Sequence, residues 1–551
     1  MRLLRPAAAA LLAAFIAACT QAPESASPGP SPTSSSTTGA PTPSAAAGDT
    51  EPDPSESQEE QAPGGDDDVL SVAIAAPQTL DPMTMSDPAS TLVARQLFEG
   101  LTRWDQSKET VRRAAAKSWR AMNGGRRFIF TLRKGMTFHD GTRVDAADFK
   151  FAFDRIARRE NASAIAFLLE DVAGFDRFNG RGRGSGLRGV KARNRTTLVI
   201  SLSRPNYNLP AILTHPALVP LPDSGRRPAR RPVGNGPFRM PRPWEPGSDL
   251  VLDTFDDFYR EPRLDGIRFR VYEDPALAWI PFTNGEIHVA EVPVGRYADA
   301  AGEYGAEPVP LLSSYYFGLN LESRALKSLR IRRAVTFAID PARIRDQIYK
   351  GAMRSARGIV PSGMPGAGGN ACKTFCTHAP ARAKRLMRRV PKRARDLFLE
   401  FTHGSPHQRV AERVARDLES VRFDVAIRGM SLRRYVRVLT RGAAGLFRLG
   451  WIAEYPSPGA VLDPLFRSTS PNNYTGFDSR RVDTLLSRAR AEARDRVRAR
   501  LYRRAERAIL RAAPIVPIGS FVARWAVQPN VAGVEFDVMG GFDAAPVSID
   551  G

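Results

Sequence analysis

An abrupt change in composition near residue 68 limits which part of this chain can fold. Residues 19–68 consist mainly of Pro, Ser, Thr, Ala and Gly, and then of Asp and Glu, without an apolar period. Such a segment buries too little apolar surface to offset the entropy lost on ordering. We therefore predict a disordered tether over 19–68 and a folded body from Val69 to Gly551, which is long enough for more than one domain.

The N-terminus consists of two arginines and a short apolar run over residues 7–18. This run has the length of a signal-peptide core and is too short to span a bilayer. It ends in Ile-Ala-Ala-Cys, which resembles the lipobox of bacterial lipoproteins. The resemblance implies that residues 1–18 are a signal peptide and that Cys19 carries a lipid, which anchors the protein to the outer face of the cell membrane. An ordinary signal peptide with an incidental cysteine is the alternative.

The formal net charge of +22 raises the question of a nucleic-acid partner. Of the 80 basic residues, 70 are Arg, a skew that is typical of a GC-rich genome. The basic residues are also dispersed, with one cluster of eight at 382–395 and others along a predicted helix at 488–511. We expect solvated basic faces, with attraction to anionic lipid or wall polymer as the alternative, and no nucleic-acid partner.

Cys372 and Cys376 are the only cysteines of the body, and they lie in a loop rich in Gly and Pro. A close pair in an exported protein usually oxidises, so we predict a structural disulfide. A metal site with His378 is the alternative, but the second pair of ligands that zinc needs is missing. We expect no metal.

Sequence motifs of the common enzyme classes are absent. There is no Gly-x-Ser-x-Gly elbow and no His-Glu-x-x-His, and no cysteine is left over as a nucleophile. His403 and His407 are four residues apart, but Gly404 and Pro406 disfavour a helix that would present them together. The sequence therefore predicts a protein that is not an enzyme and needs no cofactor.

A series of motifs follows along the body, including Asp145–Phe149 and Val482–Asp483, in an order that resembles one known family. The others are Leu80–Pro82, Phe98–Leu101, Ala116–Trp119, Phe130–Gly141, Pro232–Phe238, Tyr315–Asn320, Arg332–Val335, Ala338–Asp340, Gly450–Pro458 and Asn472–Tyr474. This order is similar to that of family 5 of the bacterial extracellular solute-binding proteins, the oligopeptide, dipeptide and nickel receptors of ABC importers. The resemblance covers essentially all of 70–551.

The resemblance implies an α/β, two-lobed periplasmic-binding-protein fold of type II, the large peptide-binding class with an extra subdomain. The lobes are joined by a hinge of two crossing strands, near 315–320 and 514–520. The implied boundaries are 69–314 with 514–551 for lobe I, about 110–195 for its extra subdomain, and 315–513 for lobe II.

The same resemblance points to residues of the ligand cleft. Glu454 stands where peptide-binding relatives use an Asp to hold the α-ammonium of the ligand, and a structural or solvated acid is the alternative. Trp451 and Tyr455 are expected to line the cleft. Weaker candidates are Ser86 and Asp87 in a loop that offers backbone groups to an extended peptide, one of Tyr315 and Tyr316 on a crossing strand, and Asn320 as a hinge residue.

The expected function is capture of an oligopeptide or dipeptide by strand addition, in which main-chain hydrogen bonds supply the affinity. The partners implied are the permease subunits of an ABC importer with their cytoplasmic ATPases, and we expect a monomer. Two alternatives keep the fold: a metal chelate or other small solute as cargo, and a surface sensor that does not transport.

Overall fold

The computed structural model describes residues 68–223 and 230–550. The predicted signal peptide (1–18), the predicted lipid attachment at Cys19 and the predicted tether (19–68) lie outside the described residues, except for Asp68. Within the two described ranges, no helix is both long enough and apolar enough to cross a membrane.

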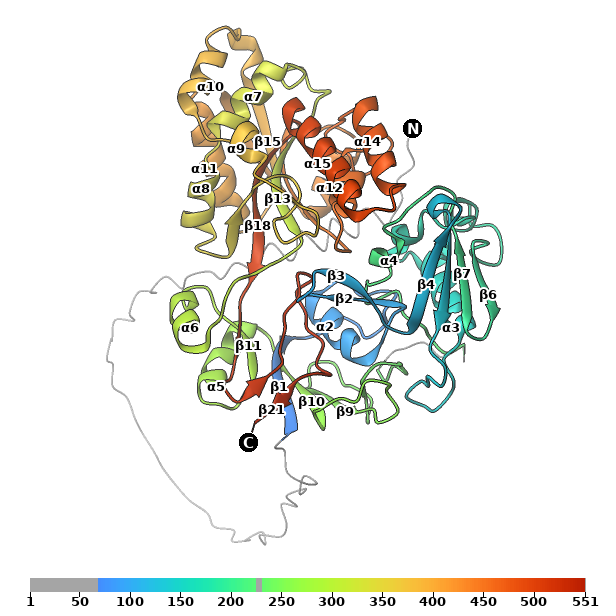
Figure 1. Cartoon of the computed structure of the whole chain (residues 1–551). Helices are drawn as coiled ribbons and strands as arrows, with labels where there is room; N and C mark the ends of the chain where they lie inside the picture. Colours follow the sequence, from blue (N-terminus) through green and yellow to red (C-terminus); the bar gives the residue numbers. More distant parts are fainter. Residues whose placement is uncertain (1–67, 224–229, 551) are drawn as a thin grey trace, which may run out of the picture.

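Two mixed sheets form the cores of two lobes (Figure 1). We call lobe I the part around the six-stranded sheet and lobe II the part around the seven-stranded sheet. In lobe I, β1 pairs in parallel with β10 and β11, and its nearly continuous apolar sequence suits a strand buried on both faces. The strands of this sheet, in spatial order, are β19 (Trp525–Val527), β11 (Val289–Glu291), β1 (Val69–Ala75), β10 (Gly266–Tyr272), β9 (Leu250–Thr254) and β8 (Phe238–Arg239).

A second, antiparallel sheet extends lobe I, and α3 (Ala146–Ala157) packs on it. Asp145 and Asp148 fix the start of α3 through a capping box, because each side chain accepts a backbone N–H of the first turn. The strands of this sheet are β4 (Ala116–Met122), β5 (Arg127–Leu132), β7 (Thr197–Ser201) and β6 (Val190–Asn194). Lobe I also contains the hairpin of β2 (Thr102–Asp105) and β3 (Thr110–Arg113), the pair of β20 (Val531–Ala532) and β21 (Ser548–Ile549), and the helices α2 (Pro88–Leu97), α4 (Leu209–Ile212), α5 (Trp279–Thr283) and α6 (Tyr297–Tyr304).

Lobe II has helices on both faces of its sheet. One apolar core joins the sheet to α7, α10 and α11, and another joins its opposite face to α12, α13, α14 and α15. The strands, in spatial order, are β12 (Val309–Pro310), β18 (Ile515–Ala523), β13 (Ser313–Leu319), β17 (Leu446–Ile452), β15 (Asp396–Thr402) and β16 (Asp424–Met430), with β14 (Met353–Ser355) beside β18. The helices are α7 (Leu329–Ala338), α8 (Pro341–Arg343), α9 (Cys372–Phe375), α10 (Pro380–Met387), α11 (His407–Glu419), α12 (Leu432–Thr440), α13 (Gly459–Phe466), α14 (Arg480–Arg490) and α15 (Asp495–Ala512).

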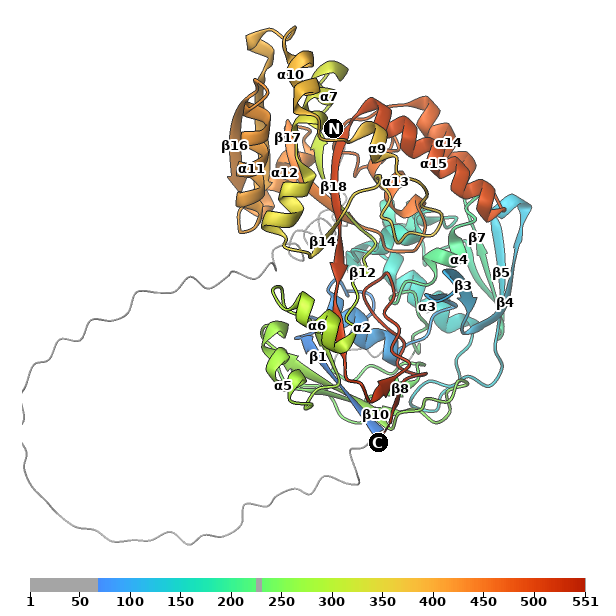
Figure 2. The same ribbon diagram turned by 60° about the vertical axis from the view of Figure 1, so that its left-hand side comes forward.

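The chain passes between the lobes at β12–β13 and returns at β18. Figure 2 shows β18 running from lobe II toward lobe I, where Arg524 alone separates it from β19 of the other sheet. The apolar run Ile515–Ile518 of β18 is buried, as is β13, which lies between β18 and β17. Two buried strands therefore connect the lobes.

The predicted helix over 488–511 is wrong, because the structure divides this region between α14 and α15. In a continuous helix the carbonyl of Arg490 would accept the N–H of Arg494. Instead it accepts the N–H of Tyr207 in lobe I at 2.8 Å, and the N–H of Arg494 donates to the Glu492 carboxylate at 3.0 Å. A contact with the other lobe thus ends α14.

Candidate functional site

Strand β17 has one edge that is only partly covered. It pairs with β13 along its full length, but with β15 only at its first two residues. Ala453, directly after β17, donates its N–H to Leu312 beside β13. Because main-chain groups alternate in direction along a strand, those of Gly450 and Ile452 point to the opposite edge. Among the described residues no strand pairs with β17 there.

The part of this edge that lies nearer to β15 is closed by α12. The hydroxyl of Tyr435, a fully buried residue of α12, donates to the carbonyl of Arg448. The Arg448 side chain is buried as well, and its guanidinium lies 3.3 Å from the hydroxyl of Thr402 and 5.6 Å from the ring of Tyr315. The uncovered stretch of β17, by which we mean the stretch without a strand partner on this edge, is therefore short. Gly450 within it is buried, and Ile452 at its end is exposed.

Glu454 follows β17 and contacts lobe I. Its Oε2 lies 3.1 Å from Nε2 of His215. Nδ1 of the same ring accepts the N–H of Ala217 at 3.2 Å, so the neutral imidazole carries its proton on Nε2 and donates it to the carboxylate. The side chains of His215 and Glu454 remain 10% and 16% exposed. The carboxylate is thus oriented from the opposite lobe and still meets solvent.

Trp451 and Tyr455 flank Glu454 and have different surroundings. Trp451 is buried in lobe II, and its Nε1 donates to the carbonyl of Ala460 at 2.7 Å. Tyr455 is half-buried and packs against the apolar cores of both lobes. Burial raises the pKa of the Tyr455 hydroxyl well above its usual value, so it remains protonated. Tyr455 therefore belongs to the contact between the lobes.

The candidate loop of lobe I has one exposed side chain and one that caps a helix. Ser86 is exposed. Asp87 is the N-cap of α2, and its carboxylate accepts the N–H of Ser90 at 2.8 Å and the hydroxyl of Ser90 at 2.5 Å. The Asp87 carboxylate thus has structural partners, while Ser86 keeps its polar groups toward solvent.

Tyr315 and Tyr316 point to opposite faces of β13, as neighbours in a strand do. Tyr315 lies in the core beneath α7 and α11, Tyr316 lies in the core beneath α12–α15, and both are buried. Asn320 is also buried, and its amide donates to the carbonyls of Gly442 (3.0 Å) and Ala444 (2.8 Å). Asn320 thus fixes the loop that leads into β17.

A buried ion pair between the lobes was not predicted from the sequence. Asp171 of lobe I contacts Arg490 of α14, and both side chains are less than 10% exposed. The Asp171 carboxylate also accepts hydrogen bonds from Asn206 (2.8 Å) and Arg204. We call Asp171, Arg204, Asn206 and Arg490 the interlobe clamp. No motif marks it, because its two halves are far apart in sequence.

A second buried polar contact lies beside the clamp. The amide of Asn208 donates to the hydroxyl of Tyr502 at 2.8 Å, and the hydroxyl of Ser457 donates to the Asn208 carbonyl oxygen at 3.1 Å. All three residues are buried. Asn208 belongs to lobe I, and its two partners belong to lobe II. The helical layer of α14 and α15 is therefore joined to lobe I by paired polar groups.

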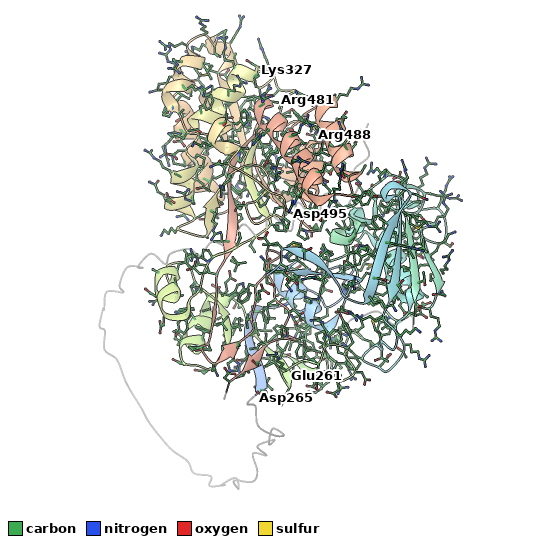
Figure 3. All side chains as sticks on the ribbon, in the orientation of Figure 1. Glu261, Asp265, Lys327, Arg481, Arg488 and Asp495 are labelled. Atoms are coloured by element: carbon green, nitrogen blue, oxygen red, sulfur yellow. A yellow bond between two sulfur atoms is a disulfide. The ribbon has the colours of Figure 1, made fainter. Side chains whose placement is uncertain are left out.

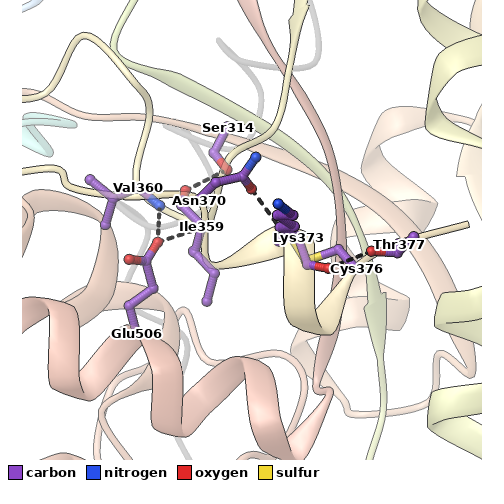
Figure 4. Close-up of a disulfide and its surroundings, with 9 residues drawn as sticks. Ser314, Ile359, Val360, Asn370, Lys373, Cys376, Thr377 and Glu506 are labelled. Atoms are coloured by element: carbon purple, nitrogen blue, oxygen red, sulfur yellow. Dashed lines mark hydrogen bonds between the residues drawn. A yellow bond between two sulfur atoms is a disulfide. The ribbon is translucent and has the colours of Figure 1, made fainter.

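Cys372 and Cys376 form a disulfide around α9 (Figure 4). Beside it, the Glu506 carboxylate of α15 accepts the N–H groups of Ile359 (2.7 Å) and Val360 (2.9 Å). The disulfide and Glu506 thus hold the long loop before α10 onto lobe II. In the described part of the chain, no group of three or more His, Cys, Asp or Glu residues is arranged to hold a metal ion.

The chain is similar over most of its length to known solute receptors. A family model for bacterial extracellular solute-binding proteins, family 5 Middle, matches residues 110–473. The oligopeptide-binding protein OppA of Bacillus subtilis (strain 168) is 25% identical over 485 residues, 83% of this chain and 88% of OppA. The probable deoxycholate-binding periplasmic protein YgiS of Escherichia coli (strain K12) is 26% identical over 487 residues, with the same two coverages.

Solved structures show the same fold. The unliganded open form of MppA, a periplasmic murein tripeptide binding protein, matches with a TM-score of 0.75 and 22% identity, over 88% of this chain and 98% of MppA. This match confirms the predicted two-lobed α/β fold. The relatives are binding proteins and not enzymes, as predicted, and the family acts outside the cytoplasm. This chain belongs to the bacterial extracellular solute-binding proteins, family 5.

Proposed function

We propose that this protein is the lipid-anchored substrate-binding component of an ABC importer. It captures an extended peptide between its lobes and delivers it to a membrane permease. The observation that carries the proposal is the uncovered edge of β17, with the Glu454 carboxylate directly beyond its end.

The uncovered edge suits a peptide because a peptide in extended conformation is itself a strand. Gly450 and Ile452 offer main-chain groups that a bound peptide pairs with, whatever its side chains are. Gly450 has no side chain to obstruct an approaching backbone. In this proposal Ser86, an exposed residue of lobe I, supplies polar groups to the peptide from the opposite lobe. Affinity from the main chain explains how one receptor accepts many sequences.

Glu454 supplies a negative charge at one end of this edge. Its Oε2 accepts from His215, and within the described part of the chain Oε1 has no hydrogen-bond partner. A ligand ammonium bound at Oε1 forms a charge-assisted hydrogen bond, the stronger kind in proteins. Since Glu is longer than Asp, the fixed position that His215 gives its carboxylate offsets the added freedom of the side chain.

Relatives and the N-terminal sequence support the transport role. OppA of Bacillus subtilis is named for oligopeptide binding, and MppA for binding a murein tripeptide. An anchor at Cys19 keeps the receptor at high local concentration beside its permease. The Cys19→Ser variant is expected to leave the membrane fraction, and retention of that variant in membranes would contradict lipid anchoring.

The test of the ligand site is the Glu454→Ala variant, compared with Glu419→Ala. Glu419 is an exposed glutamate of α11 in the same lobe. Calorimetry with short peptides should show about 10- to 100-fold weaker binding for Glu454→Ala, the loss expected for a charged hydrogen bond. The same peptides with an acetylated N-terminus should bind the variant and the wild type alike.

Two outcomes contradict parts of the proposal separately. Equal losses for free and acetylated peptides would remove the ammonium role of Glu454 but keep peptide capture. Absence of any peptide, both in native mass spectrometry of the purified protein and in binding to a peptide library, would remove peptide capture itself.

A different cargo on the same fold is the second candidate. Glu454 already has His215 as a hydrogen-bond partner, and the relative YgiS is named for binding deoxycholate rather than a peptide. Native mass spectrometry and elemental analysis of protein from its natural source identify a small solute or a metal chelate directly. A locus without permease and ATPase genes would favour a sensor.

A further inference from the structure

The excess of positive charge belongs to one lobe. Residues 315–513, the predicted extent of lobe II, hold 42 Lys and Arg against 16 Asp and Glu, a formal charge of +26. Residues 69–314 with 514–551 hold 36 against 32, a formal charge of +4. The two lobes are parts of one chain under one codon bias. A GC-rich genome therefore explains why Arg replaces Lys, but not why one lobe is basic.

One positive surface of lobe II, without acidic residues in its sequence, is formed by two packed helices, α7 and α10, with the short helix η8 (Lys392–Ala394) that follows them. All the basic residues that make up this surface are exposed. We call it the basic cap, and its residues are Lys327, Arg330, Arg333, Arg382, Lys384, Arg385, Arg388, Arg389, Lys392 and Arg393.

No acidic residue lies within either stretch that forms the basic cap, and the nearest in sequence are Glu322 and Asp396. Among the described residues, none of the basic cap side chains forms an ion pair. Arg382 stacks over the ring of Phe337 at 4.3 Å, and the others extend outward. Like charges that lack counter-charges repel one another, so the basic cap is expected to bind an external polyanion.

The basic cap lies at the end of lobe II that is remote from lobe I. Figure 1 shows α7 and α10 at this end, and Figure 3 labels Lys327 there, whereas β1 enters the fold at the opposite end of the molecule. The acidic segment 49–68 of the same chain ends at Asp68, which joins β1. That segment is therefore attached on the side of the molecule opposite the basic cap, which disfavours it as the binding partner of the cap.

We infer that the basic cap docks lobe II on an anionic phospholipid bilayer. The guanidinium group forms paired hydrogen bonds with phosphate, and each basic residue near an anionic bilayer adds to the attraction. Among the described large apolar residues of α7 and α10, Leu329 is exposed and Leu386 is partly exposed, which suits contact with a charged surface rather than insertion. The inference rests on the proposed lipid anchor, which holds the protein within reach of a bilayer.

The test uses the chain that begins at Thr20, because lipid at Cys19 would itself retain the protein on vesicles. All described helices and strands lie after this point, so the chain keeps its fold. Sedimentation with phosphatidylcholine vesicles, with or without phosphatidylglycerol, should show binding only when the anionic lipid is present. Binding should weaken as salt is raised.

The decisive variant replaces Arg385, Arg388, Arg389 and Arg393 with Gln. Its matched control replaces Arg181, Arg183, Lys191 and Arg193, exposed basic residues of lobe I, with Gln. The cap variant should bind anionic vesicles at least about tenfold more weakly, and the control should bind like the unchanged protein. Circular dichroism and peptide binding of both variants show whether the fold and the cleft are intact.

Three results would overturn the inference. Equal losses in the two variants would show general attraction without a docking surface. Absence of binding to anionic vesicles would exclude the bilayer as the partner. Binding of the cap to a polyglycerol phosphate, measured without vesicles, would indicate that its partner is wall polymer. Each leaves peptide capture untouched, because peptide affinity is measured on the same proteins. If the protein without substitutions bound no peptide, the proposed function would be contradicted, but the docking of lobe II on a bilayer would not be.

Discussion

Two of the contacts between the lobes include a carboxylate, and they differ in how completely its charge is satisfied. In the interlobe clamp, the Asp171 carboxylate accepts from three side chains, and Arg490 is almost fully buried against it. In the pair of Glu454 and His215, one carboxylate oxygen has a partner and the group still meets solvent. The first contact has no capacity for a ligand, and the second retains some.

This difference separates a structural contact from one that is available for binding. A buried charge without its partner is costly, so the clamp is stable only as a complete set. A partly exposed carboxylate that accepts from a neutral imidazole loses little if that partner moves. We therefore expect mutations in the clamp to act on stability, and mutations of the pair to act on ligand binding.

The largest effect is expected for Asp171→Ala. Removal of this carboxylate takes away the acid in direct contact with the buried Arg490 guanidinium and leaves only Asp463 at 4.0 Å, at a cost of about 3–5 kcal/mol in unfolding free energy. Urea unfolding measures it, and Glu160→Ala, an exposed acid of the same lobe, serves as control. A loss no larger than that of the control would mean that the clamp contributes nothing to stability.

The next effect concerns Asp463, which lies beside Arg490 and accepts from Arg467. Burial raises the pKa of Asp463 to about 6 from 3.8, and this outweighs the attraction of Arg467. The folded protein therefore holds this proton more tightly than the unfolded chain does. The protonated Asp463 therefore contributes to the unfolding free energy. This contribution is fully present below a pH of about 4 and is lost as the pH rises through about 6, and it amounts to about 3 kcal/mol.

The Asp463→Asn variant tests this pH dependence. Because Asn does not titrate, the variant should lack the decline, and its unfolding free energy relative to wild type should rise between the two pH limits. Urea unfolding over the acidic to neutral range measures the difference. Asp478→Asn, an exposed acid in lobe II, should show no such trend. A difference that is constant with pH would refute the raised pKa.

The smallest effect on stability is expected for His215→Ala, about 1 kcal/mol, the size of one neutral hydrogen bond. Its effect on ligands should be larger, because the Glu454 carboxylate loses its fixed position. The preference for free over acetylated peptides should fall, and His215→Gln, which keeps an N–H donor, should restore part of it. Destabilisation as large as for Asp171→Ala would erase the distinction between the two contacts.

Local features of the fold were predictable from the sequence because they depend on near neighbours. The apolar run of β1 and the alternating pattern of β5 appear as strands, and the Asp145 capping box starts α3 as its spacing indicates. The helix predicted over 488–511 failed for the opposite reason. Its interruption depends on Tyr207, which is far away in the chain.

The candidate site was predictable in part. The family resemblance selected Glu454 as a candidate, and the structure has this residue two positions after the end of β17. The partner of Glu454 was not predictable, because His215 lies 239 residues earlier and in no motif. The engagement of Asp87 as the cap of α2 is a local pattern, Asp-Pro followed by Ser, that sequence reasoning passed over.

The order of the motifs was enough to identify the family, and composition was enough to show that the positive charge is concentrated in 315–513. The polar groups that meet across the lobes became known from the three-dimensional arrangement alone. Asp171 with Arg490, Asn208 with Tyr502, and His215 with Glu454 are each separated by more than 200 residues of chain. Such pairs form when apolar cores bring the lobes together, so no local pattern encodes them.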